Sequence, residues 1–326
     1  MGCAHHARPN AEGHGATVSA VRALLVANPS ATTTTAAGRD VIAHALASEL
    51  KLEVMATRYR GHAAELAARA ASEGVDLVVV LGGDGTVNEA LNGLLVDGPG
   101  DRIPALGVVP GGSANVFARA LGVPRDPLEA THQLLEALAA GRSRTVGLGR
   151  ADERWFSFNA GLGWDADVIA AMEHARDRGR EATPTRYVAT SFRRWATART
   201  NPPSLRVEIP GREPIEGVKL ALVSNTDPWT YLGSRAVRTN PGCSFEGGLG
   251  LFGLHRLGLP TIGRIVHRIL SEDGFTEMAS VLRDDDVPAL RITSDEPVNL
   301  QVDGDHLGRR SDVEFLAVPH ALRVVV

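Results

Sequence analysis

The stretch VVVLGGDGTVNEALNGL, residues 78–94, joins a buried strand to a helix through a glycine-rich turn. Aliphatic residues fill 78–81, and 87–94 repeat apolar residues at helical spacing. Glycine lets a backbone come close to a ligand, and the first amides of a helix have no intrahelical partner. An anion is favoured at such a helix start, so the turn is predicted to bind phosphate.

Asp84 lies in the middle of this turn, where a carboxylate would repel phosphate. It fits the site if a divalent metal ion lies between the two, or if the carboxylate acts on a hydroxyl group. The alternative is structural, because Asp84 or Thr86 could simply cap the helix that begins near Val87.

The first half of the chain alternates strand and helix patterns, which predicts a parallel sheet covered on both faces. An α/β nucleotide-binding domain is expected over 21–148. Two of its strands end in glycine pairs, at Gly82-Gly83 and Gly111-Gly112, and ligands bind outside the carboxyl ends of such strands. We therefore expect the two loops to face one crevice. The predicted strands are 22–29, 52–57, 75–83 and 104–112, and the predicted helices are 38–50, 61–72, 86–95 and 126–141.

The second half is strand-rich, and a C-terminal β-sandwich is expected over 149–320. The last strand, 321–326, could join either domain. Residues 1–20 lack the apolar core of a signal peptide and are expected to be a disordered tail. The predicted strands of this half are 153–163, 205–211, 216–225, 248–257, 289–295, 298–305 and 313–319, and helices are expected at 164–177, 184–199 and 261–271.

Composition excludes several classes of protein. A net charge of −4 and a pI near 6.3 argue against a nucleic-acid binder. Cys3 and Cys243 do not suggest a disulfide framework, which favours the cytoplasm. No window is apolar enough to span a membrane, so any membrane contact is expected to be peripheral. Lys51 and Lys219 are the only lysines, so phosphate chemistry must use backbone amides, arginine or a metal ion.

Several named motifs are absent. The chain has no P-loop, and the dinucleotide fingerprint fails because Asn88 stands where its third glycine would be. A nucleophilic Ser113 would need glycine at 115, where Asn115 stands. A Ser113 hydrolase stays as an alternative to the simpler reading of Ser113 as a helix cap.

Several motifs together resemble the diacylglycerol kinase catalytic superfamily, specifically the bacterial soluble lipid kinases related to sphingosine kinases. Three of them carry most of the likeness: GGDGTVNEALNGL (82–94), VVPGGSANVFARALG (108–122) and QVDGDHLG (301–308). The likeness continues, in the family's order, through NPS (28–30), TRYRGHAAELA (57–67), FNAGLGWDADV (158–168) and PGCSFEGGLGLF (241–252).

The resemblance implies a nucleotide domain like those of NAD kinases and diacylglycerol kinases, followed by a β-sandwich. It implies ATP and Mg²⁺ as cofactors and transfer of the γ-phosphoryl group to a lipid hydroxyl. Diacylglycerol, giving phosphatidic acid, is the first candidate; a sphingoid base or another lipid alcohol is the alternative. The implied ATP-binding residues are Asn28, Thr57, Gly82, Gly83, Asp84, Gly85, Thr86, Val87, Asn88 and Ser113. Glu89 and Asn92 would support the loop from the helix, or form a solvated face.

Asp303 and Asp305 match the family's D-G-E segment, which implies a catalytic base there, although Asp305 is one methylene shorter than the usual glutamate. Asp-Gly is also a strong hairpin-turn signal. Sphingosine kinases imply Asp84 as the base instead, so all three carboxylates are candidates.

The resemblance implies a structural Mg²⁺ site that is altered here, because Gly247 replaces the family's aspartate; the adjacent Glu246 is the candidate metal ligand that could compensate. Asp165 and Asp167 are candidates for the lipid headgroup, or for stabilising a helix start. The partner implied is a lipid at the cytoplasmic face of the inner membrane, where the basic segment 174–199 could rest on anionic headgroups or form a solvated face. A homodimer is compatible with the sequence, which does not fix the oligomeric state. The rivals are NAD kinase and a nucleotide-binding regulator without turnover.

Overall fold

The computed structural model describes residues 21–177, 203–269 and 280–326, apart from 32 and 34, together with 189–191, 193, 194 and 278. The predicted tail at 1–20 lies outside the described residues. Most of the predicted helix 184–199, and with it most of the basic segment proposed for lipid headgroups, also lies outside them.

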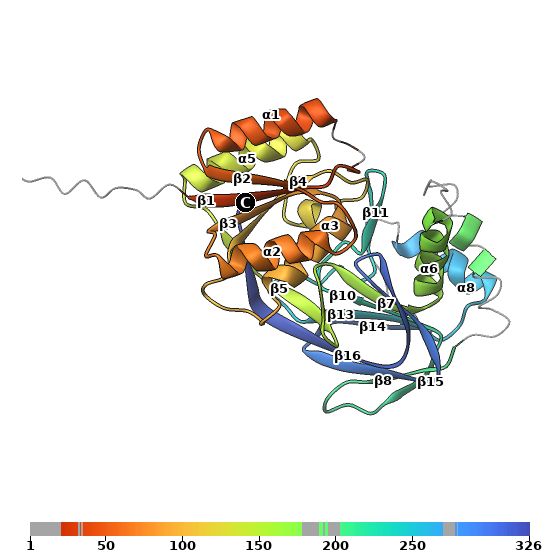
Figure 1. Cartoon of the computed structure of the whole chain (residues 1–326). Helices are drawn as coiled ribbons and strands as arrows, with labels where there is room; N and C mark the ends of the chain where they lie inside the picture. Colours follow the sequence, from red (N-terminus) through yellow and green to blue (C-terminus); the bar gives the residue numbers. More distant parts are fainter. Residues whose placement is uncertain are drawn as a thin grey trace, which may run out of the picture.

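The N-terminal region is a parallel sheet in the order β4-β3-β1-β2 with helices on both faces. Every residue of β3 and β4 is buried, as their unbroken apolar sequences require. Helices α1 and α5 lie above the strands in Figure 1, and α2 and α3 lie below them. The strands are β1 (Arg22–Ala27), β2 (Lys51–Ala56), β3 (Leu77–Gly82) and β4 (Ala105–Pro110), and the helices are α1 (Ala36–Ala47), α2 (His62–Ser72), α3 (Asp84–Leu94), α4 (Val116–Ala120) and α5 (Pro127–Ala139).

The C-terminal region is rich in antiparallel strands that run on from the same hydrogen-bonded sheet. Helices α6 (Trp164–Asp177) and α8 (Leu259–Ile269) cover one of its faces, since Trp164 and Ile265 pack in one cluster with strand residues. The strands are β5 (Arg144–Ala151), β6 (Arg154–Phe156), β7 (Asn159–Gly163), β8 (Leu205–Glu208), β9 (Ile215–Val218), β10 (Leu220–Ser224), β11 (Thr230–Leu232), β12 (Arg235–Val237), β13 (Leu249–Leu254), β14 (Val281–Val287), β15 (Ala289–Val302) and β16 (Asp305–Val324).

Strand β15 belongs to both layers of this region. Its first half pairs with β8 and its last residues pair with β7. Leu290 and Ile292 from one end and Leu300 and Val302 from the other are buried in a single core cluster. The sheet therefore folds over on itself around an apolar core, and the predicted fold class, α/β followed by a strand-rich region, is confirmed.

Strand β16 connects the two regions. It leaves the turn after β15, pairs with β5, and ends with Val324 opposite Leu106 of β4. The predicted strands 313–319 and 321–326 are thus parts of one strand. β5 and β14 are absent from the predicted strands, because glycines interrupt RTVGLGRA and a run of charges fills VLRDDDV. The exact domain boundaries stay a prediction.

Candidate active site

The two glycine pairs predicted to face one crevice are packed backbone against backbone. The Gly111 amide donates to the Gly82 carbonyl over 2.8 Å. A Cβ added to Gly112 would lie 2.7 Å from the Gly83 Cα, a distance that real side chains do not adopt. Glycine is needed on both loops because only the missing side chains allow this approach.

Other predicted nucleotide-binding residues surround these loops at the carboxyl edge of the parallel strands. Asn28 follows β1 and Thr57 follows β2. The Asn28 Nδ2 donates to the Thr86 hydroxyl over 2.9 Å, so it fixes the start of α3. Ser113 is exposed on the loop after β4. Val87 is buried, 2% exposed, and lies beneath this edge.

The Asp84 carboxylate points toward the start of α4. Its Oδ1 accepts a hydrogen bond of 3.4 Å from the Phe117 amide. Burial, reinforced by the charge of Asp303, raises the pKa of Asp84 to about 7, against the opposing effect of the amides at 115–117. A carboxylate in this state gains from a nearby cation, which would favour its ionised form.

Asp303 and Gly304 form the two-residue turn between β15 and β16, with φ of 47° and 81° and Val302 paired with Asp305. Positive φ at both central residues is the type I′ geometry that Asp-Gly favours. The turn and the functional readings of this segment are therefore compatible, because the hairpin carries Asp305 to the glycine loop.

The Asp303 carboxylate is fully occupied by hydrogen bonds. Its Oδ2 accepts from Asn88 Nδ2 at 2.8 Å and from the amide and hydroxyl of Ser157 at 2.7 and 2.8 Å. Its Oδ1 accepts from the amides of Phe158 and Asn159 at 3.0 and 3.1 Å. Burial raises the pKa of Asp303, and these donors oppose that effect. Five donors use the lone pairs of one carboxylate, which leaves none for an incoming hydroxyl.

Asp305 is differently placed, with 22% of its side chain exposed. Its Oδ1 lies 3.9 Å from where a Cβ on Gly85 would stand, so it faces the first turn of α3. Arg60 Nη2 lies 3.4 Å from Oδ1, and Arg154 Nη2 lies 3.8 Å from Oδ2. Burial raises the pKa of Asp305 and the two arginines counteract the rise.

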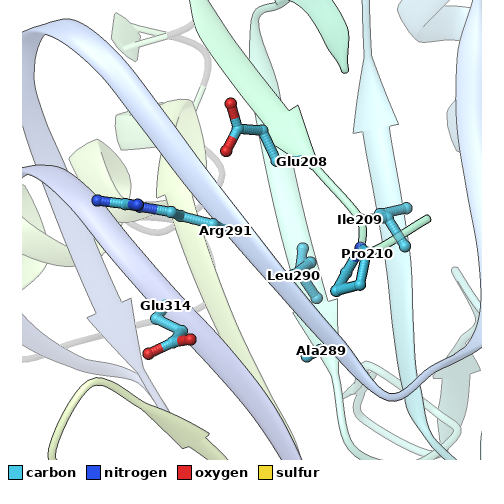
Figure 2. Close-up of a pocket in the computed structure, with 7 residues that line it drawn as sticks. All are labelled: Glu208, Ile209, Pro210, Ala289, Leu290, Arg291 and Glu314. Atoms are coloured by element: carbon cyan, nitrogen blue, oxygen red, sulfur yellow. The ribbon is translucent and has the colours of Figure 1, made fainter. Parts of the chain in front are cut away.

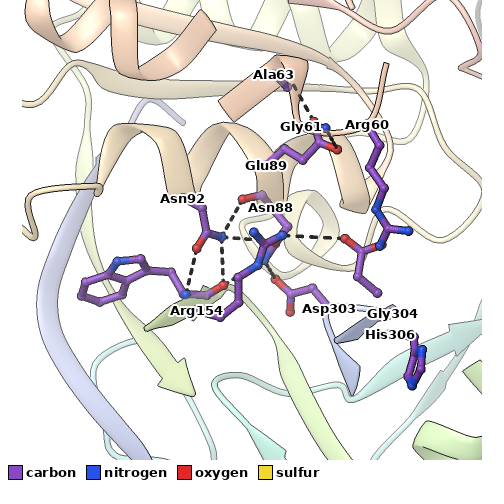
Figure 3. A network of polar contacts seen from close by, with 12 residues as sticks. Arg60, Gly61, Ala63, Asn88, Glu89, Asn92, Arg154, Asp303, Gly304 and His306 are labelled. Carbon is purple, nitrogen blue, oxygen red and sulfur yellow. Dashed lines mark hydrogen bonds and ion pairs between the residues drawn. The ribbon is translucent and has the colours of Figure 1, made fainter. Parts of the chain in front are cut away.

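Helix α3 is anchored by three of its side chains, Asn88, Glu89 and Asn92, as Figure 3 shows. Asn88 is fully buried and reaches Asp303. Glu89 accepts from the amides of Gly61 and Ala63 at 2.8 and 3.2 Å, which caps the start of α2. Asn92 exchanges two hydrogen bonds, of 3.0 and 3.1 Å, with the Trp155 backbone. Glu89 and Asn92 thus tie α3 to α2 and β6 and do not form a solvated face, while their support of the glycine loop stays a prediction.

A pocket of about 280 Å³ is lined in part by His306, the residue that follows Asp305. The Glu173 carboxylate on its wall accepts from the His306 amide at 3.3 Å and lies 3.2 Å from Arg60 Nη2. Asn299 Nδ2 donates to Asp167 at 2.6 Å. The lining residues are Asp167, Ala170, Ala171, Glu173, His174, Arg194, Asn299 and His306.

Asp165 does not line this pocket. It is 8% exposed, and its Oδ2 accepts from Gln301 Nε2 at 2.9 Å. Burial raises its pKa to about 7. Of the two aspartates predicted to meet the lipid headgroup, only Asp167 is therefore on the pocket wall.

Comparison with known proteins identifies the part of the chain that holds the glycine loops. Residues 22–151 match the family model described as diacylglycerol kinase catalytic domain. This part of the chain is thus similar to diacylglycerol kinase catalytic domains. The resemblance read from the motifs is thereby confirmed.

Curated relatives of this domain include a diacylglycerol kinase of Bacillus subtilis (strain 168), 36% identical over 151 residues that cover 44% of this chain and 46% of the relative. A second relative, a probable lipid kinase YegS-like protein of Chromohalobacter salexigens, is 39% identical over 117 residues, 36% of each chain. The matches thus span less than half the length of these relatives.

Solved structures extend the likeness of fold beyond the diacylglycerol kinase catalytic domain. A diacylglycerol kinase structure from Bacillus anthracis str. Sterne has a TM-score of 0.69 and 21% identity, covering 94% of this chain and 97% of that one. An NAD kinase from Archaeoglobus fulgidus in complex with ATP has a TM-score of 0.50 and 12% identity, covering 93% of both chains. At these identities the likeness establishes the fold alone.

The residues around the glycine loop suit a Mg²⁺ ion that is held by the protein and a bound phosphate together. Among the described residues there is no group of three or more acidic, histidine or cysteine side chains placed to hold a metal ion. Mg²⁺ is commonly bound by one or two carboxylates plus substrate phosphates, and Asp84 offers such a carboxylate beside the glycine loop. Glu246, the candidate for the separate structural metal, instead accepts from Arg144 Nε at 3.0 Å, and this partner lowers its pKa.

Several residues near Asp303 and Asp305 are not among those predicted from the sequence. Arg60 lies inside the quoted TRYRG motif, yet its spacing gives no sign of contact with Asp305. Arg154, Ser157 and Glu173 come from β6, the segment after it and α6, and the fold alone brings them to the β15–β16 turn.

A second pocket, of about 220 Å³, lies between β8, β15 and β16, and all its lining residues fall outside 22–151. Figure 2 shows Glu208, Arg291 and Glu314 around it. Arg291 Nε donates to Asp312 over 2.7 Å. None of the predicted site residues lines this pocket. In the part of the chain that the structure describes, no helix is long and apolar enough to cross a membrane.

Proposed function

We propose that the protein is an ATP- and Mg²⁺-dependent lipid kinase that uses Asp305 as its catalytic base. One observation carries the proposal: Asp305 lies 3.9 Å from the Gly85 Cβ position in the glycine loop, and the next residue, His306, lines the pocket together with Glu173. A lipid that entered through that pocket would bring its hydroxyl to Asp305 and the glycine loop together, which is the arrangement that phosphoryl transfer needs.

We choose Asp305 as the base because, of the three candidate aspartates, its carboxylate oxygens have the fewest hydrogen-bond donors. Asp303 already accepts five hydrogen bonds, so it is proposed to position the hairpin. Asp84 faces the amides at the start of α4 and is proposed to hold Mg²⁺ together with the phosphates. When bound, Mg²⁺ supplies positive charge that offsets the charge of the triphosphate.

The proposed transfer is a single displacement. The lipid hydroxyl oxygen bonds to the γ-phosphorus of ATP, and the bond from that phosphorus to the β–γ bridging oxygen breaks. Asp305 takes the hydroxyl proton, and ADP leaves with the bonding electron pair. Asn28, Thr86 and the glycine loop are proposed to orient the triphosphate, with Ser113 and Thr57 at its flanks.

Diacylglycerol is the first candidate acceptor, on the basis of the catalytic-domain family. A sphingoid base is the second, because Asp167 and Glu173 on the pocket wall could pair with its ammonium group. Both carboxylates already have partners, Asn299 and Arg60, which makes the neutral acceptor the better fit.

The lipid would be met at the cytoplasmic face of the membrane by peripheral contact. Helix α8 and the segment just before it offer a surface for it, because Arg256, Arg264 and His267 are exposed and residues 255–269 include no acid. Leu259 beside them is 56% exposed. In Figure 1, α8 lies next to α6, the helix that lines the pocket.

The test is transfer of labelled phosphate from ATP to a panel of diacylglycerol, sphingoid base, monoacylglycerol and NAD. Label on diacylglycerol is expected, and Asp305→Asn should lower turnover about 10² to 10⁴-fold. Asp305→Glu, which restores the family's residue, is the matched variant that should keep activity. Label on NAD alone, or on no member of the panel, contradicts the proposal. Labelling of Ser113 by a fluorophosphonate probe would support the rival hydrolase.

A further inference from the structure

Two arginines converge on the proposed catalytic carboxylate from different elements. Arg60 precedes α2, and Arg154 belongs to β6. Their Nη2 atoms lie 3.4 and 3.8 Å from the two oxygens of Asp305. The positive charges of the arginines offset the negative charge of Asp305 and favour its ionised form. Asp305 is the group that would have to accept a proton during transfer.

Neither arginine is fully used by its present partners. The Arg60 side chain is 63% exposed, so solvent leaves room for it to turn toward a new partner. The Arg154 Nε is buried and finds no hydrogen-bond partner among the described residues. A buried donor without an acceptor is uncommon, and it marks capacity for a further oxygen ligand.

The position of both groups suits an anion at the glycine loop. Asp305 itself lies against the first turn of α3, so the guanidinium groups are close to the predicted phosphate site. Neither lysine of the chain can take this part, because Lys51 starts β2 and Lys219 lies between β9 and β10. Arginine binds phosphate through paired N–H donors, which gives it geometric specificity as well as charge.

We infer that Arg60 and Arg154 form a clamp for the terminal phosphoryl group of a nucleoside triphosphate, and that they exchange Asp305 for this group when the nucleotide binds. The inference rests on the proposed kinase function and adds a binding site to it. Before binding, both arginines face Asp305, while Arg154 also donates to Asn88 Oδ1 and Arg60 pairs with Glu173. After binding, they contact phosphate oxygens, and Asp305 is free to accept the hydroxyl proton.

The charges explain why an exchange is needed. Arg60 and Arg154 face the carboxylates of Asp305 and Glu173, with Asp303 close behind them. A phosphoryl group that entered without displacing these pairs would lie beside carboxylates, with the arginines still engaged elsewhere. If the phosphoryl group instead pairs with Arg60 and Arg154, their positive charges attract it and offset the repulsion from the carboxylates.

The clamp predicts a difference between two nucleotides. A terminal phosphoryl group is present in a non-hydrolysable ATP analogue and absent from ADP. Arg60→Ala and Arg154→Met are therefore expected to weaken the analogue about 10- to 100-fold, as for loss of a charged hydrogen bond, and to change ADP affinity less than twofold. Calorimetry with Mg²⁺ and each nucleotide measures both values without any lipid.

Matched controls are available in the loop that holds Arg60 and on β5, the strand that pairs with β6. Arg58→Ala removes an exposed arginine two residues from Arg60, and Arg150→Ala removes one whose side chain is 34% exposed, against 29% for Arg154. Both should bind the analogue as the unchanged protein does. Methionine at 154 keeps the aliphatic stem, and thermal unfolding in the absence of nucleotide checks that each variant folds.

The outcomes separate the clamp from the kinase proposal. Equal loss of both nucleotides in the variants, or loss of neither, overturns the clamp while nucleotide binding by the unchanged protein stands. Failure of the unchanged protein to bind any nucleotide overturns the kinase proposal itself. Selective loss of the analogue, together with about 10² to 10³-fold slower turnover, supports the clamp.

Discussion

Asn88 Nδ2 donates a hydrogen bond of 2.8 Å to Oδ2 of Asp303, a residue 215 positions further along the chain. The bond joins the helix that follows the glycine loop to the hairpin that carries Asp305. Asp303 holds the other side of this junction through Ser157, Phe158 and Asn159. The distance between phosphate loop and proposed base is therefore set by one buried carboxylate.

Asp303 and Asp305 should differ sharply in their effect on stability. Asp303→Asn puts an NH₂ group among five donors, and we expect it to lower the free energy of unfolding by about 2 to 4 kcal/mol. Asp305→Asn should change that free energy by less than about 1 kcal/mol, because its partners are partly exposed arginines. Urea unfolding at pH 7.5 measures both. Equal effects would contradict the assignment of a connecting role to Asp303.

The contact between the glycine loops should not tolerate a methyl group. Gly112→Ala would place a Cβ 2.7 Å from the Gly83 Cα, so we expect the loops to separate and the melting temperature to fall by several degrees. Gly100→Ala is the control, since nothing lies within 4 Å of its Cβ position. Differential scanning calorimetry compares the two, and a Gly112→Ala protein as stable as the control would show that the loops can part without cost.

Stability should fall as pH rises through the range in which Asp165 ionises. Burial raises its pKa to about 7, whereas the unfolded chain titrates near its ordinary value of about 4. Between these values the folded protein holds a proton that the unfolded chain has lost, so the free energy of unfolding decreases as pH rises from about 4 to 7.

Asp165→Asn removes the carboxyl group that titrates, so it should flatten this dependence of stability on pH. The neutral amide oxygen can still accept a hydrogen bond from Gln301 Nε2. Denaturant titrations at pH 5, 6, 7 and 8 give the slope. Part of the slope should remain, since the pKa of Asp84 is also raised to about 7. Exposed Asp97→Asn is the control and should leave the slope unchanged; an Asp165→Asn slope equal to it would refute the prediction.

Membrane contact through α8 should depend on charge. Each arginine near an anionic surface contributes about 1 kcal/mol, so Arg256→Glu with Arg264→Glu should weaken binding to phosphatidylglycerol vesicles at least 25-fold. Vesicle sedimentation at low salt measures this, with phosphatidylcholine vesicles for comparison. Arg102→Glu with Arg142→Glu makes the same charge change at exposed positions of the N-terminal region and should bind as the unchanged protein does. Equal weakening in both double variants would show that net charge, and not α8, decides the binding.

Local sequence predicted the parts of the site that depend on backbone. The strands before Gly82 and Gly111 are continuous apolar runs, and glycine pairs after buried parallel strands have few structural explanations other than close approach. The Asp303-Gly304 turn was likewise readable, because its positive φ values favour those two residues.

The sequence by itself thus determined the alternation of strand and helix, the two glycine loops and the hairpin that bears Asp303 and Asp305. The tertiary structure decided which carboxylate is free. The lone pairs of Asp303 are used by donors from α3 and the segment after β6, and the oxygens of Asp305 face arginines from α2's leading loop and β6. Hydrogen bonds and ion pairs between distant segments depend on distances of a few ångströms, which residue spacing along the chain does not encode.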